Sequence, residues 1–248
     1  MRPWLYRLGT DRTLERLNAL AEESHLRTAS GRAVRFVPPA AADAYYEIGV
    51  FESGRVQTRA ENLHDLFNAL AWLAYPKIKA QINALHAAEI PREHGRRGRK
   101  RDLLTLLDEG GAIVQCSDSD LIELARSFRW KALFWERRAQ LLRSMRIRVL
   151  GHATLEQALK PWPGIACKAL FVPADADPDA AAAAWLAALP PQATPRALAP
   201  LPVFGYPGWL PGSERADFYD DGRYFRPFKG RPDRAAPGPL ALPRDAVR

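Results

Sequence analysis

Residues 62–74 read Asn-Leu-His-Asp-Leu-Phe-Asn-Ala-Leu-Ala-Trp-Leu-Ala. Plotted at helical pitch, this stretch separates into two faces. The apolar face holds Leu63, Leu66, Phe67, Leu70 and Leu73. The opposite face holds His64, Asp65, Asn68 and Trp72. Because a solvated helix face normally carries long charged side chains, these short polar groups indicate a half-buried polar network or a functional site.

A second helix is predicted directly after the first, over residues 77–89. Pro76 suits the first turn of a helix, because the N–H that proline lacks would have no partner there. The apolar stripe of this helix is formed by Ile78, Ile82 and Leu85. Its other side carries Lys79, Asn83 and His86. The chain therefore contains two consecutive helices that both present polar side chains.

Two β-hairpins are predicted around this helical pair. Strands over residues 45–51 and 55–58 would flank the turn Glu52-Ser53-Gly54. Strands over 103–107 and 112–116 would flank Asp108-Glu109-Gly110-Gly111, where the two acidic residues would serve turn geometry and solubility. Further strands are expected over 34–37, 146–150 and 167–172, and further helices over 11–24, 118–144, 154–159 and 180–189.

These elements predict an α+β fold with a single domain over residues 1–229. The helices 62–74 and 77–89 would pack on a small mixed sheet to which both hairpins contribute. From Pro195 onward the chain is rich in Pro, Gly and aromatic residues, which predicts an ordered irregular segment wrapped around the domain. After Lys229 the aromatic residues vanish, and residues 230–248 are expected to form a flexible tail.

The composition limits the environment and the partners of the chain. Its 248 residues carry a formal net charge of +8, with a sequence pI near 9.8, which permits anionic partners without requiring them. Cys116 and Cys167 are too few for a disulfide framework and have no metal-binding spacing, so both are expected to be reduced and buried. No stretch approaches membrane-spanning length, and the N-terminus lacks the apolar core of a signal peptide. A cytoplasmic protein without a membrane partner is expected.

Motifs spread through the chain resemble one known family. They are Tyr46-Glu47, Thr58-Arg59, Asn62-x-His64-Asp65-Leu66-Phe67-Asn68-Ala69-Leu70-x-Trp72, Pro76-x-x-Lys79, Asn83-x-x-His86, Arg101-Asp102-x-x-Thr105-x-x-Asp108-Glu109, Gly151-His152, Pro200-Leu201-Pro202, Pro207-Gly208-Trp209 and Phe218-Tyr219-Asp220-Asp221. In this order they resemble the bacterial domain-of-unknown-function family 3025, from about residue 29 to residue 227. The resemblance implies a single bacterial domain and no particular activity.

The leading functional hypothesis is a hydrolase, with or without the assistance of a divalent metal ion. His64, Asp65 and His86 could supply metal ligands, with Asn68, Glu47 and His152 as further candidates. Arg59 would hold an anionic group of the substrate, and Glu47 would act as a base. Adjacent residues on a helix point about 100° apart, so His64 and Asp65 can share one ion only at a helix end. The ordinary alternative is that these groups cap helices and bond buried backbone.

Two further chemical readings are open. A hairpin followed by the helix 62–74 is the order found in ββα metal nucleases, although Glu47 stands where such an enzyme has its general-base histidine. His152 and Glu156 would pair at i, i+4 on a short helix, either as a structural contact or as an acid–base pair. No glycine-rich phosphate loop and no Gly-x-Ser-x-Gly motif is present, which disfavours P-loop and serine chemistry.

A basic stretch at residues 92–101 supports a non-enzymatic hypothesis. It reads Arg-Glu-His-Gly-Arg-Arg-Gly-Arg-Lys-Arg, which predicts an exposed, mobile loop. Nucleic-acid phosphates could bind Arg96, Arg97, Arg99, Lys100 and Arg101. Trp209 or Tyr219 could then stack on exposed bases. A structural or interaction module is the third hypothesis. For the enzyme hypothesis the partner would be a small-molecule or anionic substrate.

Overall fold

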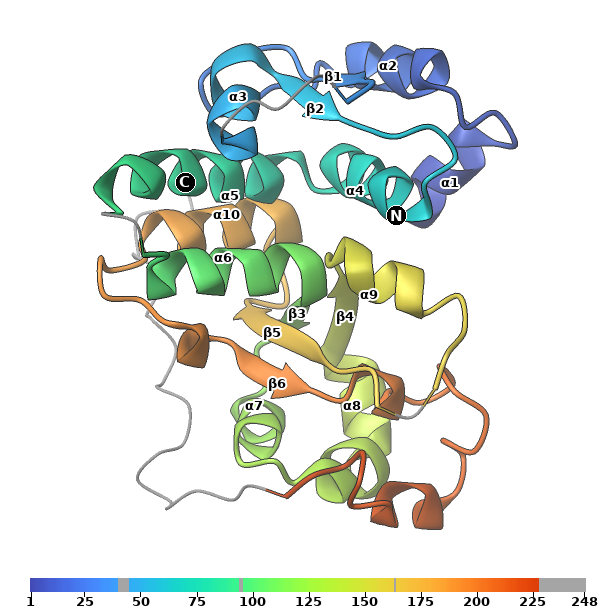
Figure 1. Ribbon diagram of the computed structural model, residues 1–248. Coiled ribbons are helices and arrows are strands. Elements are labelled where there is room, and N and C mark those ends of the chain that lie inside the picture. The colour runs from blue at the N-terminus through green and yellow to red at the C-terminus, as the bar shows by residue number, and fades with distance from the viewer. Residues whose placement is uncertain (40–44, 94–95, 163, 228–248) are drawn as a thin grey trace.

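A four-stranded mixed sheet lies at the centre of the computed structural model, which describes residues 1–39, 45–93, 96–162 and 164–227 (Figure 1). Its strand order is β4-β3-β5-β6. The strands are β3 (Gly111–Cys116), β4 (Met145–Val149), β5 (Cys167–Val172) and β6 (Ala199–Leu201). β3 pairs parallel with β5, whereas β4 and β6 pair antiparallel at the two edges. Every residue of β3 is buried, as expected for a central strand with both faces covered. The predicted mixed sheet is confirmed.

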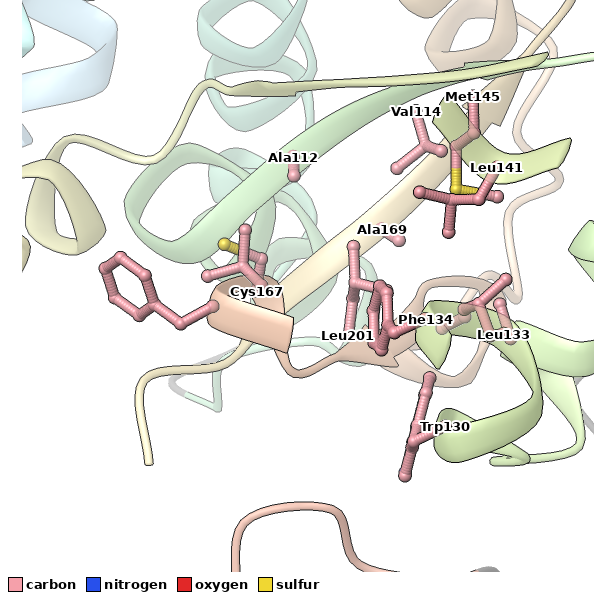
Figure 2. Close-up of a cluster of buried hydrophobic side chains, with 14 of the residues drawn as sticks. Ala112, Val114, Trp130, Leu133, Phe134, Leu141, Met145, Cys167, Ala169 and Leu201 are labelled. Atoms are coloured by element: carbon pink, nitrogen blue, oxygen red, sulfur yellow. The ribbon is translucent and has the colours of Figure 1, made fainter. Parts of the chain in front are cut away.

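One face of the sheet is covered by short helices and by the C-terminal segment. The helices are α7 (Ser119–Arg126), a π-helical turn (Ala132–Glu136) and α8 (Arg138–Ser144). Figure 2 shows Val114, Phe134 and Leu201 among the buried side chains of this core. On this face the C-terminal segment adds the 3₁₀ helices Val203–Gly205 and Ala216–Asp220, whereas the 3₁₀ helix Pro195–Ala197 packs against residues 99–110 on the other face. The C-terminal segment buries Tyr219, Tyr224 and Phe225 against the core shown in Figure 2, which confirms the expected aromatic wrap.

The other face of the sheet carries two layers of helices. The helices α6 (Arg99–Gly110) and α10 (Pro178–Ala187) lie directly on it, with α9 (His152–Gln157) beside them (Figure 1). The helices α4 (Leu63–Ala74) and α5 (Pro76–Glu89) form the next layer and confirm the predicted helical pair. The prediction that this pair packs directly on the sheet is wrong, because α6 and α10 fill the space between. Asp179 of α10 caps α5 by accepting from the backbone N–H of Lys77 and Ile78, both at 2.9 Å.

The N-terminal part of the chain packs on the far side of α4. It contains α1 (Arg2–Leu8), α2 (Leu14–Glu23), α3 (Tyr46–Ser53) and a parallel pair of short strands, β1 (Arg35–Val37) and β2 (Arg55–Gln57). The helix expected over residues 11–24 begins at Leu14 with Thr13 as its N-cap, and Asp11 accepts hydrogen bonds from Thr13. The side chain of Asn18 bonds both the N–H and the C=O of Phe36, which joins α2 to β1.

The first predicted hairpin, over residues 45–58, is wrong. Residues 46–53 form the helix α3, and β2 pairs with β1 instead of with residues 45–51. Gly54 has φ 76° and ends the helix in the left-handed region. A polar residue followed by glycine is typical of both a hairpin turn and a helix C-terminus, so the local pattern could not separate the two. A Cβ at Gly54 would lie 2.1 Å from the backbone oxygen of Ala33, so the close approach of β1 requires glycine.

The second predicted hairpin, over residues 103–116, is also wrong. Residues 99–110 form the helix α6, which runs straight into β3. Leu103, Leu104 and Leu107 are fully buried, and their spacing is that of one helix face. Asp108 and Glu109 are therefore helical residues and do not form a turn.

Smaller departures concern the basic stretch and the region 118–144. A 3₁₀ helix covers Ile90–Arg92 and α6 starts at Arg99, so the loop expected over 92–101 is shorter than predicted, and its residues 94–95 lie outside the described residues. The expected helix 118–144 is interrupted at Phe128, which has φ 61°. The expected tail 230–248 also lies outside the described residues. None of the described helices is long and apolar enough to span a bilayer.

Candidate functional site

A buried ion pair between Lys79 of α5 and Asp108 of α6 lies at the centre of the polar side chains. Lys79 is 4% exposed, and its Nζ contacts Asp108 Oδ1 and donates to Asn68 Oδ1 at 2.8 Å. Burial on its own would raise the pKa of Asp108, but the charge of Lys79 and the neighbouring His152 outweigh it, so this pKa is lowered. The carboxyl group of Asp108 is therefore ionised at neutral pH.

His152 of α9 lies on the far side of Asp108. Its Nδ1 is 3.9 Å from Asp108 Oδ2, which is too long for a hydrogen bond, and this nitrogen has no hydrogen-bond partner among the described residues. Burial lowers the pKa of His152 to about 4, against the smaller opposing effect of Asp108. The imidazole is therefore neutral at physiological pH although it stands beside a carboxylate.

His64 connects this buried group to the solvent. Its ring meets the ring of His152 edge to face, with centroids 4.5 Å apart. Its Nδ1 lies 3.0 Å from Oε2 of Glu156, and both side chains are partly exposed, at 36% and 44%. The i, i+4 spacing had predicted a contact of Glu156 with His152 instead. Both residues do lie on α9, but His152 packs toward Asp108 and Glu156 reaches across to α4.

These contacts form one continuous chain, here called the polar network: Glu156, His64, His152, Asp108, Lys79 and Asn68. It runs from a half-exposed carboxylate on α9 to a buried ammonium on α5. Hydrogen bonds join Glu156 to His64 at its solvent end and Asp108, Lys79 and Asn68 at its buried end, whereas a ring contact and an electrostatic contact through His152 join the two ends.

A second set of contacts surrounds Glu47 of α3 and His86 of α5. Asn83 Nδ2 donates to the backbone oxygen of Glu47 at 2.9 Å and to its Oε2 at 2.7 Å. Burial raises the pKa of Glu47, an effect that the Asn83 hydrogen bond opposes. Arg101 of α6 donates to His86 Nδ1 at 3.2 Å and pairs with Glu93 at 2.7 Å. Burial lowers the pKa of His86 to about 4, so it is a neutral acceptor for Arg101.

Arg59 and Asp65 bind each other at the start of α4. Asp65 accepts from the backbone N–H of Arg59 at 2.7 Å, from its Nε at 2.8 Å and from its Nη2 at 2.9 Å. Asn62, the N-cap of α4, accepts from the backbone N–H of Asp65 at 3.0 Å. These contacts hold the loop before α4 in place. Both carboxylate oxygens of Asp65 are occupied by Arg59.

The structure does not bring the predicted metal ligands together. His64 contacts Glu156, Asp65 contacts Arg59 and His86 contacts Arg101. Within the described part of the chain, no group of three His, Cys, Asp or Glu side chains is arranged to hold a metal ion. The ligand set His64, Asp65 and His86 therefore does not fit a shared ion in this arrangement.

The basic residues proposed for nucleic-acid binding fall into two groups. Three of them form ion pairs: Arg97 with Asp102 at 3.0 Å, Lys100 with Glu89 at 3.1 Å and Arg101 with Glu93. Arg96 and Arg99 are exposed. Lys100 and Arg101 are therefore held by largely buried ion pairs, whereas Arg96, Arg97 and Arg99 stay on the surface.

Comparison with known proteins places the chain in a family. The model of a family described as a protein of unknown function (DUF3025) matches residues 34–229. The chain belongs to this family. No curated protein and no solved structure matches it. The matched segment contains every residue of the polar network, and it leaves out α1 and α2.

Two helical stripes account for how this family member assembles its polar residues. On α5, Lys79, Asn83 and His86 recur at i, i+4 and i+7. On α6, Arg101, Thr105 and Asp108 recur at the same spacing. Lys79 meets Asp108 and His86 meets Arg101, so the stripes face each other with the two helices antiparallel.

Sequence reasoning missed Asp108 and Arg101 as members of the site, and it paired Glu156 with His152 instead of with His64. Asp108 was assigned to a turn and Arg101 to a loop, because residues 99–110 were not recognised as a helix. The signal was present in the spacing of Leu103, Leu104 and Leu107, which places Arg101, Thr105 and Asp108 together on one side. No local pattern joins Glu156 to His64, which is 92 residues away.

Proposed function

We propose that this protein is a hydrolase in which His64, held by Glu156, acts as the acid–base group. The observation that carries this proposal is the 3.0 Å contact between His64 Nδ1 and Glu156 Oε2 at the solvent end of the polar network. A carboxylate on Nδ1 fixes the orientation of the ring and leaves Nε2 for a water molecule or a leaving group. His64 is also accessible enough for a substrate to reach it.

Water is the nucleophile that best suits these surroundings. Both cysteines lie buried in the core beneath the sheet, where burial raises the pKa of each thiol, so neither is a ready thiolate. A partly exposed imidazole has direct access to water, and transfer of a proton from that water to Nε2 would generate the attacking hydroxide. The buried ion pair of Asp108 and Lys79 would supply a fixed field behind the imidazoles.

Arg59 remains suited to an anionic group of the substrate. Its guanidinium has five N–H donors, and the pair with Asp65 uses only Nε and Nη2. The side chain is 58% exposed. Glu47 and Asn68 lie on the other side of the Lys79–Asp108 pair, where they line a cavity that His64 does not line. We therefore assign the base role to His64 and a supporting role to Glu47 and Asn68.

A panel of chromogenic carboxyl esters, phosphoesters and amides tests this proposal. We expect hydrolysis of at least one class, and a loss of roughly 10²–10⁴-fold in kcat/KM for His64→Ala. Glu156→Gln should lower kcat more than it changes KM, and Glu156→Asp should restore part of it. The matched control is His25→Asn, since His25 is exposed, has φ 50° and accepts asparagine readily.

Two results would contradict the proposal. One is activity on the panel that His64→Ala leaves unchanged. The other is the absence of any hydrolysis by the folded wild-type protein above that of His64→Ala across all three substrate classes.

A further inference from the structure

A small cavity lies where α3, α4, α5 and α6 meet, away from the solvent end of the polar network. Its volume is about 20 Å³. Its polar lining is formed by Tyr46, Glu47, Asn68, Lys79, Asn83 and Asp108. A cavity needs roughly 10–15 Å³ to hold a water molecule, and that water needs about two to four polar partners. The size therefore admits one water and excludes an organic substrate.

Asn83 decides what this cavity can bind. Its Nδ2 donates to the backbone oxygen of Glu47, and a carbonyl oxygen can only accept, so the orientation of the amide is fixed. The Oδ1 on the other side of the amide is buried and has no hydrogen-bond partner among the described residues. Because a buried acceptor without a partner is costly, this oxygen calls for a donor beyond the described residues.

Glu47 and Lys79 supply the remaining contacts. Asn83 occupies Oε2 of Glu47, which leaves Oε1 as a second acceptor. The ammonium of Lys79 has three N–H donors, and Asn68 and Asp108 take two of them. Asn83 Oδ1, Glu47 Oε1 and Lys79 Nζ thus provide two acceptors and one donor, which is the complement of a water molecule, and the hydroxyl of Tyr46 lines the same cavity.

We propose that this cavity binds one water molecule, which donates to Asn83 Oδ1 and Glu47 Oε1 and accepts from Lys79 Nζ. Water suits the site better than ammonium or a metal ion, because a cation could accept nothing from Lys79 and would meet its positive charge. The bound water joins Glu47 to the polar network. This assignment is independent of the proposed hydrolase activity.

A high-resolution crystal structure of the full chain tests the assignment directly. We expect one solvent peak within hydrogen-bonding distance of Asn83 Oδ1, and its loss in Asn83→Leu. A peak that gains anomalous signal after a rubidium chloride soak would show a cation and overturn the proposal. So would a direct hydrogen bond from Lys79 to Asn83 Oδ1 with no solvent peak between them.

A second variant gives an answer in solution if Asn83→Leu does not fold. Val50 lines the cavity from α3 and is 1% exposed, and Val50→Ile adds one methylene group there. If the methylene displaces a bound water, Asn83 Oδ1 loses its donor and Tm falls by roughly 2–4 °C. If the cavity is dry, filling it improves packing and Tm rises, which contradicts the proposal. A crystal structure of Val50→Ile shows whether the methylene occupies the cavity.

Discussion

Lys79 and Asp108 stand 29 residues apart in the sequence and form an ion pair that is almost closed to solvent, with Lys79 only 4% exposed. The pair joins α5 to α6, and through Asn68 it also reaches α4. A buried pair of this kind gains little over an apolar replacement, yet removing one partner strands the other charge. The fold therefore depends on Lys79 and Asp108 together, because either charge without the other would be buried and unpaired.

The first prediction follows from this dependence. We expect Lys79→Met and Asp108→Leu each to lower the free energy of unfolding by about 3–5 kcal/mol, because each leaves an uncompensated buried charge. The double variant should lose less than the sum of the two, since neither charge remains. Urea unfolding of the wild type, the two single variants and the double variant completes this double-mutant cycle. If the losses in unfolding free energy simply add, the buried ion pair is contradicted.

The second prediction concerns acid sensitivity. Burial lowers the pKa of His86 and of His152 to about 4, whereas an unfolded histidine titrates near about 6.5. Between these values the unfolded state binds more protons than the folded state, so stability falls as the pH falls through this window. Each imidazole adds a slope of up to about 1.4 kcal/mol per pH unit. The pKa of Glu47 is raised by burial, so Glu47 opposes this slope.

Urea unfolding at several pH values between 7 and 4 measures this slope. The lowered pKa of Asp108 acts only below the histidine window, because an unfolded Asp titrates near about 3.9. His152→Gln should flatten the dependence between pH 6.5 and 4, whereas the exposed control His25→Asn should leave it unchanged. A His152→Gln variant that keeps the full pH dependence of the wild type would contradict the burial of His152.

The third prediction concerns the cap that α10 provides for α5. The carboxylate of Asp179 accepts from the backbone N–H of both Lys77 and Ile78. Asp179→Ala should therefore cost about 1–2 kcal/mol of stability, with Asp179→Asn less harmful because it keeps one acceptor. Asp177, the exposed N-cap of α10, gives a matched control: Asp177→Ala should cost about 1 kcal/mol or less. Equal losses for the two alanine variants would argue against the capping of α5 from α10.

The fourth prediction separates backbone strain from close approach at Gly54. Gly31 and Gly54 both have positive φ, at 83° and 76°. A Cβ at Gly31 meets nothing within 4 Å, so Gly31→Ala should cost only the strain of the left-handed region, about 1–2 kcal/mol. Gly54→Ala should cost clearly more, because its Cβ would meet the backbone of Ala33. Thermal unfolding of Gly31→Ala and Gly54→Ala measures the loss of stability in each variant. Similar losses would mean that the chain around Ala33 can move away from residue 54.

The parts of the fold that sequence could predict are those where the hydrophobic period is unambiguous. The stripe Leu66, Leu70 and Leu73 and the position of Pro76 predicted α4 and α5 correctly. The apolar run at residues 167–172 predicted β5. Both hairpins failed where a glycine follows polar residues, because the same residues end a helix. At Gly54 the neighbouring Ala33 decides between these outcomes, whereas at residues 99–110 the spacing of the buried leucines already indicated a helix.

The candidate site was predicted in part. His64 and Asn68 do belong to one polar network, since they share a helix face with the right spacing. Asp65 and His86 were assigned to the same centre, yet the fold gives each its own arginine partner. Those pairings depend on the loop before α4 and on the packing of α5 against α6. Neither follows from the spacing of residues along one helix.

The contacts that hold the helical layers together also bear on the order of folding. His64 bonds Glu156 across 92 residues, and Ile78 bonds Asp179 across 101. Closing loops of this length is entropically slow, so such contacts are expected to form after the local helices have collapsed. Substitutions at Glu156 and Asp179 should then accelerate unfolding while leaving the refolding rate nearly unchanged. The long-range contacts would therefore act mainly on the lifetime of the folded state.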